Sequence, residues 1–166
     1  MIPTNRALTF AAFALIFGAA PALAEGDKIV TSAHEEKEGD NAGIYVDFSY
    51  DCGEECYAAT LWCDGSRVLH ADIAEVTSQS AAKLILSEGQ TYPITIGSKT
   101  FKMSAQKLSF SEMSGNWEVE SYASFDSRDA YAAVAKAKTI VTKIGTEKLT
   151  LPVNKDVTDW AAACAK

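Results

Sequence analysis

Apolar and polar side chains alternate with a period of two along much of the chain between residues 44 and 123. In the first such stretch, Ile44, Val46 and Phe48 fall on one face of an extended segment, while Tyr45 and Asp47 fall on the other. This alternation is typical of a half-buried strand. Further strands are predicted at 57–63, 67–75, 83–87, 91–96, 100–104, 107–112 and 117–122. Turn residues, mostly glycine with Asp, Asn or Ser, separate these stretches.

The pattern changes after residue 126. Residues 127–137 are rich in alanine and follow a capping Asp126 or Ser127, so they predict a helix. Alternation returns at 139–144 and 148–153, and a short helix capped by Asp156 is predicted near the C-terminus. Many short strands with closely spaced turns favour a mainly β fold. We expect an antiparallel β-sandwich or barrel-like domain, with one or two short helices near the C-terminus, held by disulfides.

The N-terminal end reads as a secretory signal peptide. Residues 1–24 begin with Arg6 as a positive charge, continue with a short apolar run, and end in Ala-Leu-Ala, which matches the cleavage rule. The run is too short to span a bilayer. Residues 25–43 are acidic and poor in large apolar side chains, which predicts a flexible lead-in to a single β-rich domain at 44–166. The expected location is therefore the periplasm or the exterior.

The predicted export favours disulfide bonds between the four cysteines. Cys52, Cys56, Cys63 and Cys164 all follow the predicted cleavage point, and an even number of cysteines in an exported chain favours disulfides. We favour the pairing Cys52–Cys56, which closes a turn, with Cys63–Cys164, which pins the C-terminal segment. The competing pairing is Cys52–Cys63 with Cys56–Cys164. A zinc site would need a second ligand cluster, so we expect no metal and no cofactor.

Charge limits the partners. The chain has 15 basic and 22 acidic residues and a net charge of −7; losing Arg6 with the signal peptide leaves 14 − 22 = −8. Such a surface disfavours nucleic acid and speeds the encounter with a basic partner. We expect a basic protein or a carbohydrate as the partner. Trp62 and Tyr45 are the candidate binding residues, because both fall on the polar face of adjacent predicted strands.

One histidine offers an alternative chemistry. His70 is the only histidine within 44–166, and Asp72 falls on the same strand face. The two could act as a base and its orienting acid, or as metal ligands. The chain has no GxSxG or HExxH motif to supply the rest of a hydrolytic site. A hydrogen-bonded histidine on a sheet is therefore the favoured interpretation.

The C-terminal end carries a resemblance. The stretch LTLPV at 149–153 and the helix with Trp-Ala-Ala at 160–162 resemble the closing strand and alanine-rich tail of small exported β-sandwich proteins. The invasion-associated locus B family of alphaproteobacteria is one such group. The family's Trp-bearing first strand with its nearby cysteine has no counterpart at residues 43–46, and the cysteine spacings differ. The resemblance implies an exported β-sandwich and no site residues.

These observations favour an exported, non-enzymatic binding or inhibitor-like protein of the bacterial envelope or host interface. An inhibitor of a cationic host enzyme such as lysozyme is one concrete version. The first alternative is a small periplasmic hydrolase or metal-dependent enzyme that uses His70 and nearby carboxylates. The second is a purely structural envelope protein.

Overall fold

A computed structural model describes residues 28–37, 42–51 and 56–166. Within these residues lie nine strands and three α-helices, with one short 3₁₀ turn at Glu88–Gln90. The strands are β1 (Ile29–Glu36), β2 (Gly43–Tyr50), β3 (Tyr57–Cys63), β4 (Leu69–Val76), β5 (Thr91–Ile96), β6 (Lys99–Phe110), β7 (Trp117–Ala123), β8 (Thr139–Ile144) and β9 (Glu147–Pro152). The helices are α1 (Ser78–Ile85), α2 (Arg128–Val134) and α3 (Lys155–Cys164).

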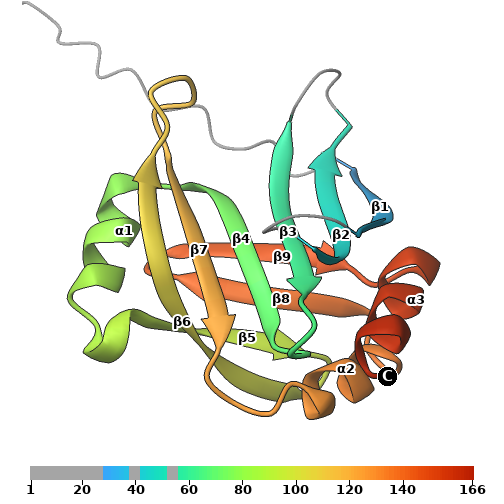
Figure 1. Cartoon of the computed structure of the whole chain (residues 1–166). Coiled ribbons are helices and arrows are strands. Elements are labelled where there is room, and N and C mark those ends of the chain that lie inside the picture. The colour runs from blue at the N-terminus through green and yellow to red at the C-terminus, as the bar shows by residue number, and fades with distance from the viewer. Residues whose placement is uncertain (1–27, 38–41, 52–55) are drawn as a thin grey trace, which may run out of the picture.

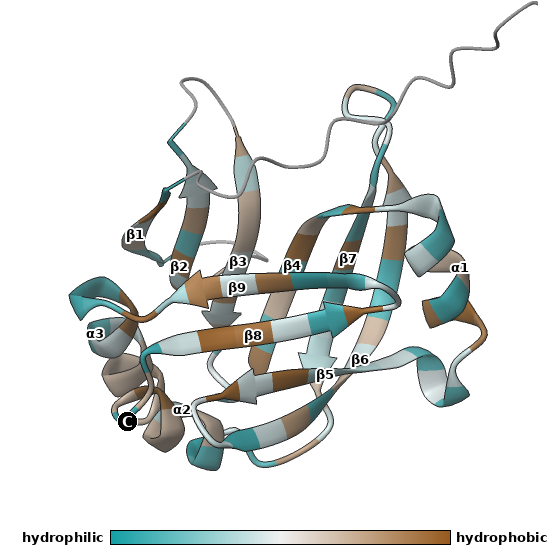
Figure 2. Cartoon of the chain, turned by 180° about the vertical axis from the view of Figure 1, so that it is seen from behind, coloured by the Kyte–Doolittle hydropathy of each residue, from teal (hydrophilic) through white to brown (hydrophobic). Residues whose placement is uncertain are grey.

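All nine strands form one antiparallel sheet in the order β1-β2-β3-β4-β7-β6-β5-β8-β9. The sheet curls into a nearly closed barrel, so that β8 and β9 cross the side opposite β2–β4 (Figures 1 and 2). The predicted mainly β, barrel-like fold is confirmed. Among the described residues, no helix is long and apolar enough to cross a membrane.

The core lies inside the curled sheet. The predicted alternation holds in β2, where Val46 and Phe48 are fully buried and Tyr45 and Asp47 point to the outer face. Buried and less buried positions also alternate along much of β4, β5, β7 and β8. The largest buried side chains of the sheet include Leu61, Ile94, Met103, Ile140 and Leu151. Burial of these side chains supplies the main driving force for closing the sheet.

Helix α3 covers one end of the barrel and is hydrogen-bonded to strands β1 and β2. Its Trp160 is buried and donates an indole hydrogen bond to the Ile44 carbonyl of β2 at 2.9 Å. Thr31 of β1 donates to Asp156 at 2.9 Å and accepts from the capping Asn154 at 2.6 Å. The helix therefore holds the β1 edge of the sheet in place.

Several local predictions differ from the structure. Helix α3 is capped by Asn154 and not by Asp156, which lies in its first turn. The segment 25–43, expected to be a flexible lead-in, contains strand β1, which pairs with β2 over its full length. Residues 83–87, predicted as a strand, belong to α1 and the turn after it, because Thr77 caps a helix whose Ala81 and Leu84 are buried. The two short strands predicted at 100–104 and 107–112 are largely one long strand, β6, with an irregularity between Ala105 and Lys107.

The β8–β9 turn is anchored on α1. Gly145 has φ +60°, a conformation that favours glycine. The following Thr146 donates its backbone N–H to the Ser80 hydroxyl at 3.0 Å. A Cβ at position 145 would lie 2.6 Å from Ser80 Cα, so the approach of turn and helix requires a residue without a side chain.

Candidate functional site: an acidic groove with an aromatic ladder

An open groove of about 500 Å³ lies on the outer face of the sheet. The alternation that buries Val46 and Leu61 turns the intervening side chains of β2, β3 and β4 outward into it. We call this surface the acidic groove. Its lining residues are His34, Glu36, Ala42, Tyr45, Asp47, Tyr57, Thr60, Trp62, Asp64, His70, Asp72, Gln106 and Glu120.

Four rings stack across four neighbouring strands along this groove. His34, Tyr45, Trp62 and His70 are direct cross-strand partners in the registers of β1–β2, β2–β3 and β3–β4. Successive ring centroids lie 5.1, 6.0 and 5.1 Å apart, and the ring planes are within 15° of parallel. We call this row the aromatic ladder. Aromatic cross-strand pairs of this kind stabilise a sheet, so the ladder ties β1 to the barrel.

The predicted pair of Tyr45 and Trp62 thus lies where the sequence placed it, on adjacent strands of one outer face. Their role in binding stays a prediction. Both side chains are partly buried, because each ring is covered by a neighbour on either side. Sequence reasoning missed His34, which it left in the lead-in. The weak signal in the sequence was the run Ile29-Val30-Thr31, whose β-branched side chains favour a strand.

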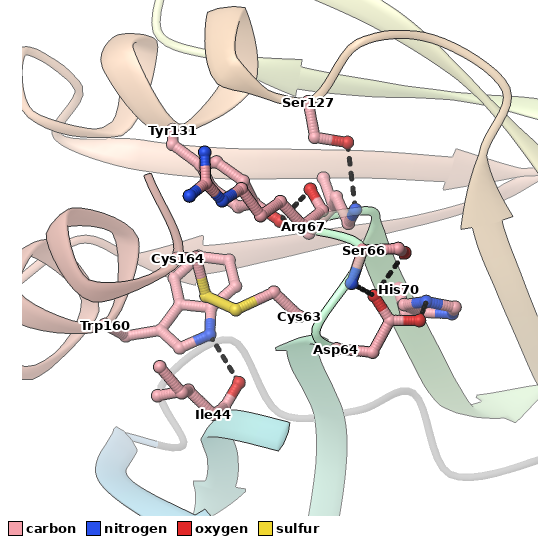
Figure 3. The surroundings of a disulfide bond; sticks show 11 residues. Ile44, Cys63, Asp64, Ser66, Arg67, His70, Ser127, Tyr131, Trp160 and Cys164 are labelled. Carbon is pink, nitrogen blue, oxygen red and sulfur yellow. Dashed lines mark hydrogen bonds and ion pairs between the residues drawn. A yellow bond between two sulfur atoms is a disulfide. The ribbon is translucent and has the colours of Figure 1, made fainter. Parts of the chain in front are cut away.

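Each histidine of the ladder has a carboxylate partner. His34 Nδ1 lies 3.2 Å from Asp47 Oδ2, and His70 Nε2 lies 3.3 Å from Asp64 Oδ2. The predicted partner of His70 was Asp72. The structure corrects this, because the turn after β3 folds Asp64 back towards the imidazole, whereas Asp72 lies in the next row along β4 (Figure 3).

Asp64 is held in its turn by its neighbours. The backbone N–H of Ser66 donates to Asp64 Oδ1 at 2.9 Å, and the Ser66 hydroxyl donates to the same oxygen. Partial burial opposes ionisation of Asp64, but the hydrogen bonds from Ser66 and the contact with His70 outweigh it and lower the pKa of the carboxyl. Asp64 is therefore a fixed negative charge at one end of the groove.

A second row of side chains runs beside the ladder. Asp47, Thr60, Asp72 and Glu120 are successive cross-strand partners on β2, β3, β4 and β7. The Thr60 hydroxyl donates to Asp47 Oδ1 at 2.6 Å. Burial raises the pKa of Asp72 to about 6, assisted by the negative charges of Glu118 and Glu120. Asp72 Oδ1 is also buried without a hydrogen-bond partner in the described part of the chain.

Tyr57 enters the groove because of a β-bulge. Simple alternation in β3 would place Tyr57 on the core face with Ala59. The register with β2 shifts between Phe48 and Ser49, so that Ala59 pairs with Phe48 and Tyr57 pairs with Ser49. One extra residue, Ala58, turns Tyr57 to the outer face. Burial then raises the pKa of the Tyr57 hydroxyl, so this group stays protonated at neutral pH.

A disulfide lies at the end of β3, next to the groove. Cys63 and Cys164 are bonded, which confirms one of the two predicted bridges and excludes the competing Cys56–Cys164 pairing. Both cysteines are buried, beside the indole of Trp160 (Figure 3). Cys52 lies outside the described residues, so the Cys52–Cys56 pairing stays a prediction. The bonded sulfurs act as a strut that fixes α3 to the strand carrying Trp62.

Searches with the chain found no matching protein-family model, curated protein or solved structure. The resemblance to the invasion-associated locus B family therefore stays a prediction. The residues of the predicted signal peptide also lie outside the described ranges, so export stays a prediction as well.

Proposed function

We propose that the acidic groove binds a basic partner protein, and that the chain is an exported, non-enzymatic binding or inhibitor-like protein. The observation that carries the proposal is the charge of the groove. Five carboxylates line it, those of Glu36, Asp47, Asp64, Asp72 and Glu120, whereas no lysine or arginine of the described residues does. A surface lined by one sign of charge raises the local concentration of ligands of the opposite sign.

The ladder favours a protein ligand over a carbohydrate. A sugar stacks on an uncovered ring face, but both faces of Tyr45 and Trp62 are occupied by neighbouring rings. The exposed ring edges instead form a rigid floor between the carboxylates. The aliphatic stems of lysine and arginine pack on such a floor while their charged ends reach the acids. Tyr and Trp are also frequent among the residues that dominate protein–protein binding energy.

A hydrolase centred on His70 is the second candidate. The pair of His70 and Asp64 could serve as a base with its orienting acid, and Asp72, with a pKa of about 6, could donate a proton near neutral pH. The hydroxyls beside them are not placed on the imidazole of His70, since Thr60 donates to Asp47 and the Tyr57 hydroxyl stays protonated. The described residues also contain no group of three His, Cys, Asp or Glu side chains that could hold a metal ion.

The test is a calorimetric titration of the protein with lysozyme as a basic protein, at low and at high salt. We expect binding at low salt that weakens as salt rises, because the attraction is between exposed charges. A triple variant of the groove, Asp47→Asn with Asp72→Asn and Glu120→Gln, should lower the affinity by on the order of tenfold.

The matched control removes the same three charges elsewhere. Glu88→Gln, Glu112→Gln and Asp129→Asn change exposed residues that do not line the groove. This variant should retain binding within roughly threefold, since only the long-range field changes. Equal losses in the two variants would show that net charge alone attracts lysozyme.

For the hydrolase alternative, His70→Ala should abolish any hydrolytic activity found; full activity in that variant would exclude the role of His70.

A further inference from the structure

A second cavity, of about 210 Å³, lies between the ends of β2 and β4 and the β8–β9 hairpin. It shares no lining residue with the acidic groove. Its lining residues are mainly apolar. They come from strands on facing sides of the curled sheet, where β8 and β9 cross opposite β2–β4 (Figure 2). The lining residues are Tyr50, Ile73, Ala74, Glu75, Val76, Thr142, Ile144, Glu147, Lys148 and Leu149. We call it the mouth cavity.

Glu147 takes a core-facing position at this cavity. In β9, Leu151, Leu149 and Glu147 follow one another at alternate positions, opposite Ile140, Thr142 and Ile144 of β8. The two carboxylate oxygens of Glu147 differ. Oε1 accepts hydrogen bonds from the hydroxyls of Thr77 at 2.7 Å and Thr146 at 3.3 Å. Oε2 is buried and has no hydrogen-bond partner among the described residues.

An unpaired buried carboxylate oxygen is costly, and it calls for a donor. The described residues supply none: Lys148, the one cationic residue that they contribute to the lining of this cavity, is exposed and forms no ion pair with Glu147. The threonines occupy only Oε1, so Oε2 is the acceptor of Glu147 that still lacks a donor at this cavity.

A second carboxylate lies at the same cavity in a strained backbone. Glu75 has φ +59°, which is unusual for a residue with a side chain. It lies in the β4 segment where the register with β7 shifts between Ile73 and Val76. Burial raises the pKa of the Glu75 carboxyl. Strain of this kind persists where the surrounding structure holds it, and it is frequent at ligand sites.

We propose that the mouth cavity binds a small amphipathic cation, a primary ammonium carried on a short alkyl or arylalkyl chain. The apolar walls take the chain, and the ammonium, which has three N–H donors, bonds to Glu147 and Glu75. A fatty acid of the same length would place its carboxylate against two others. The cavity is also smaller than the roughly 300 Å³ at which sites for drug-sized ligands begin, which keeps the ligand short.

The experiment compares three probes of equal chain length: hexylamine, hexan-1-ol and hexanoate. Each is titrated into the full chain, with affinity measured by calorimetry and location by amide chemical-shift changes. We expect hexylamine to shift resonances of β4, β8 and β9 and to bind at least tenfold more tightly than hexan-1-ol. Hexanoate should bind most weakly. Absence of hexylamine binding, or equal affinity for the amine and the alcohol, would overturn the proposal.

Variants locate the ammonium. Glu147→Gln keeps an oxygen that can accept from Thr77 but removes the charge, and we expect it to lower hexylamine affinity by roughly tenfold or more while leaving hexan-1-ol unchanged. Glu75→Gln serves as the second variant in case the first unfolds. Glu88→Gln, an exposed glutamate outside the cavity, is the control and should bind hexylamine like the parent. Unchanged hexylamine affinity in both cavity variants would contradict the assignment.

Discussion

Removal of the Cys63–Cys164 bridge is the perturbation whose size the structure sets most directly. The bridge joins residues 101 positions apart, and it links α3 to the strand that carries Trp62. The double variant Cys63→Ala with Cys164→Ala removes the cross-link without leaving a thiol that could exchange with Cys52 or Cys56. The folded contacts of α3, including the hydrogen bond from Trp160 to the Ile44 carbonyl, remain available.

In the chain-entropy model, a cross-link closing a loop of about 100 residues stabilises the folded state by about 4.7 kcal/mol, because it restricts the unfolded chain. Native strain subtracts from this figure, so we expect a loss of about 3 to 5 kcal/mol. A domain of this size has a total stability of roughly 5 to 15 kcal/mol, so the variant should fold but be marginal.

Urea unfolding followed by circular dichroism measures this loss. The midpoint should fall, and the dependence of unfolding free energy on urea should become steeper, because the uncrosslinked unfolded chain exposes more surface. A loss below about 1 kcal/mol with an unchanged slope would refute the reasoning, since it would mean that the bridge does not restrict the unfolded chain.

Three other predictions concern stability and the groove. Gly145→Ala should lower the free energy of unfolding by more than the roughly 1 kcal/mol expected of an alanine at positive φ, because the new Cβ meets the Ser80 backbone. The thermal midpoint should fall with it. Gly65→Ala is the control and should change little, since a Cβ there has nothing within 4 Å. Asp72 has a folded-state pKa of about 6 against an ordinary value of 3.8, so the folded protein binds more protons than the unfolded one between these values. Its contribution is therefore complete below about pH 4 and is lost as the pH rises through 6, by up to about 3 kcal/mol. Asp72→Asn should flatten the pH dependence of unfolding over that range and be more stable than the parent at pH 7; a steeper loss in the variant would contradict this sign. Trp62→Ala should weaken lysozyme binding and lower stability together, because it interrupts the ladder; binding unchanged in a folded Trp62→Ala protein would exclude the ladder as part of the interface.

Most strands of the barrel could be predicted because their signal is local. Val46 and Phe48 alternate with Tyr45, Asp47 and Ser49 in the chain, and the structure buries them in the same alternation. The pairing of Cys63 with Cys164 was also predictable, from the even number of cysteines after a predicted signal peptide and the placement of Cys63 on the apolar face. The order of the strands in the sheet depends on long-range pairing, and no local pattern reveals it.

The composition of the groove was only half predictable. Tyr45 and Trp62 were predicted to share an outer face, but His34 was hidden in an acidic segment whose strand depends on pairing with β2. Tyr57 reached the groove through a bulge that shifts the register by one residue, and no turn residue marks that bulge in the sequence. The partner of His70 depended on how a turn folds back, which spacing along the strand does not contain.

The claim on which the proposed function depends is that the acidic groove recognises cations. The most direct measurement follows the three tryptophan indole N–H signals by NMR while hexa-arginine, and separately hexa-glutamate, is added at low salt. We predict that hexa-arginine moves the Trp62 signal, which Trp62→Phe identifies, and leaves that of Trp160, which is buried and bonded to Ile44, in place. Hexa-glutamate should move neither. An unmoved Trp62 signal at saturating hexa-arginine, or an equal response to the two peptides, would contradict the account.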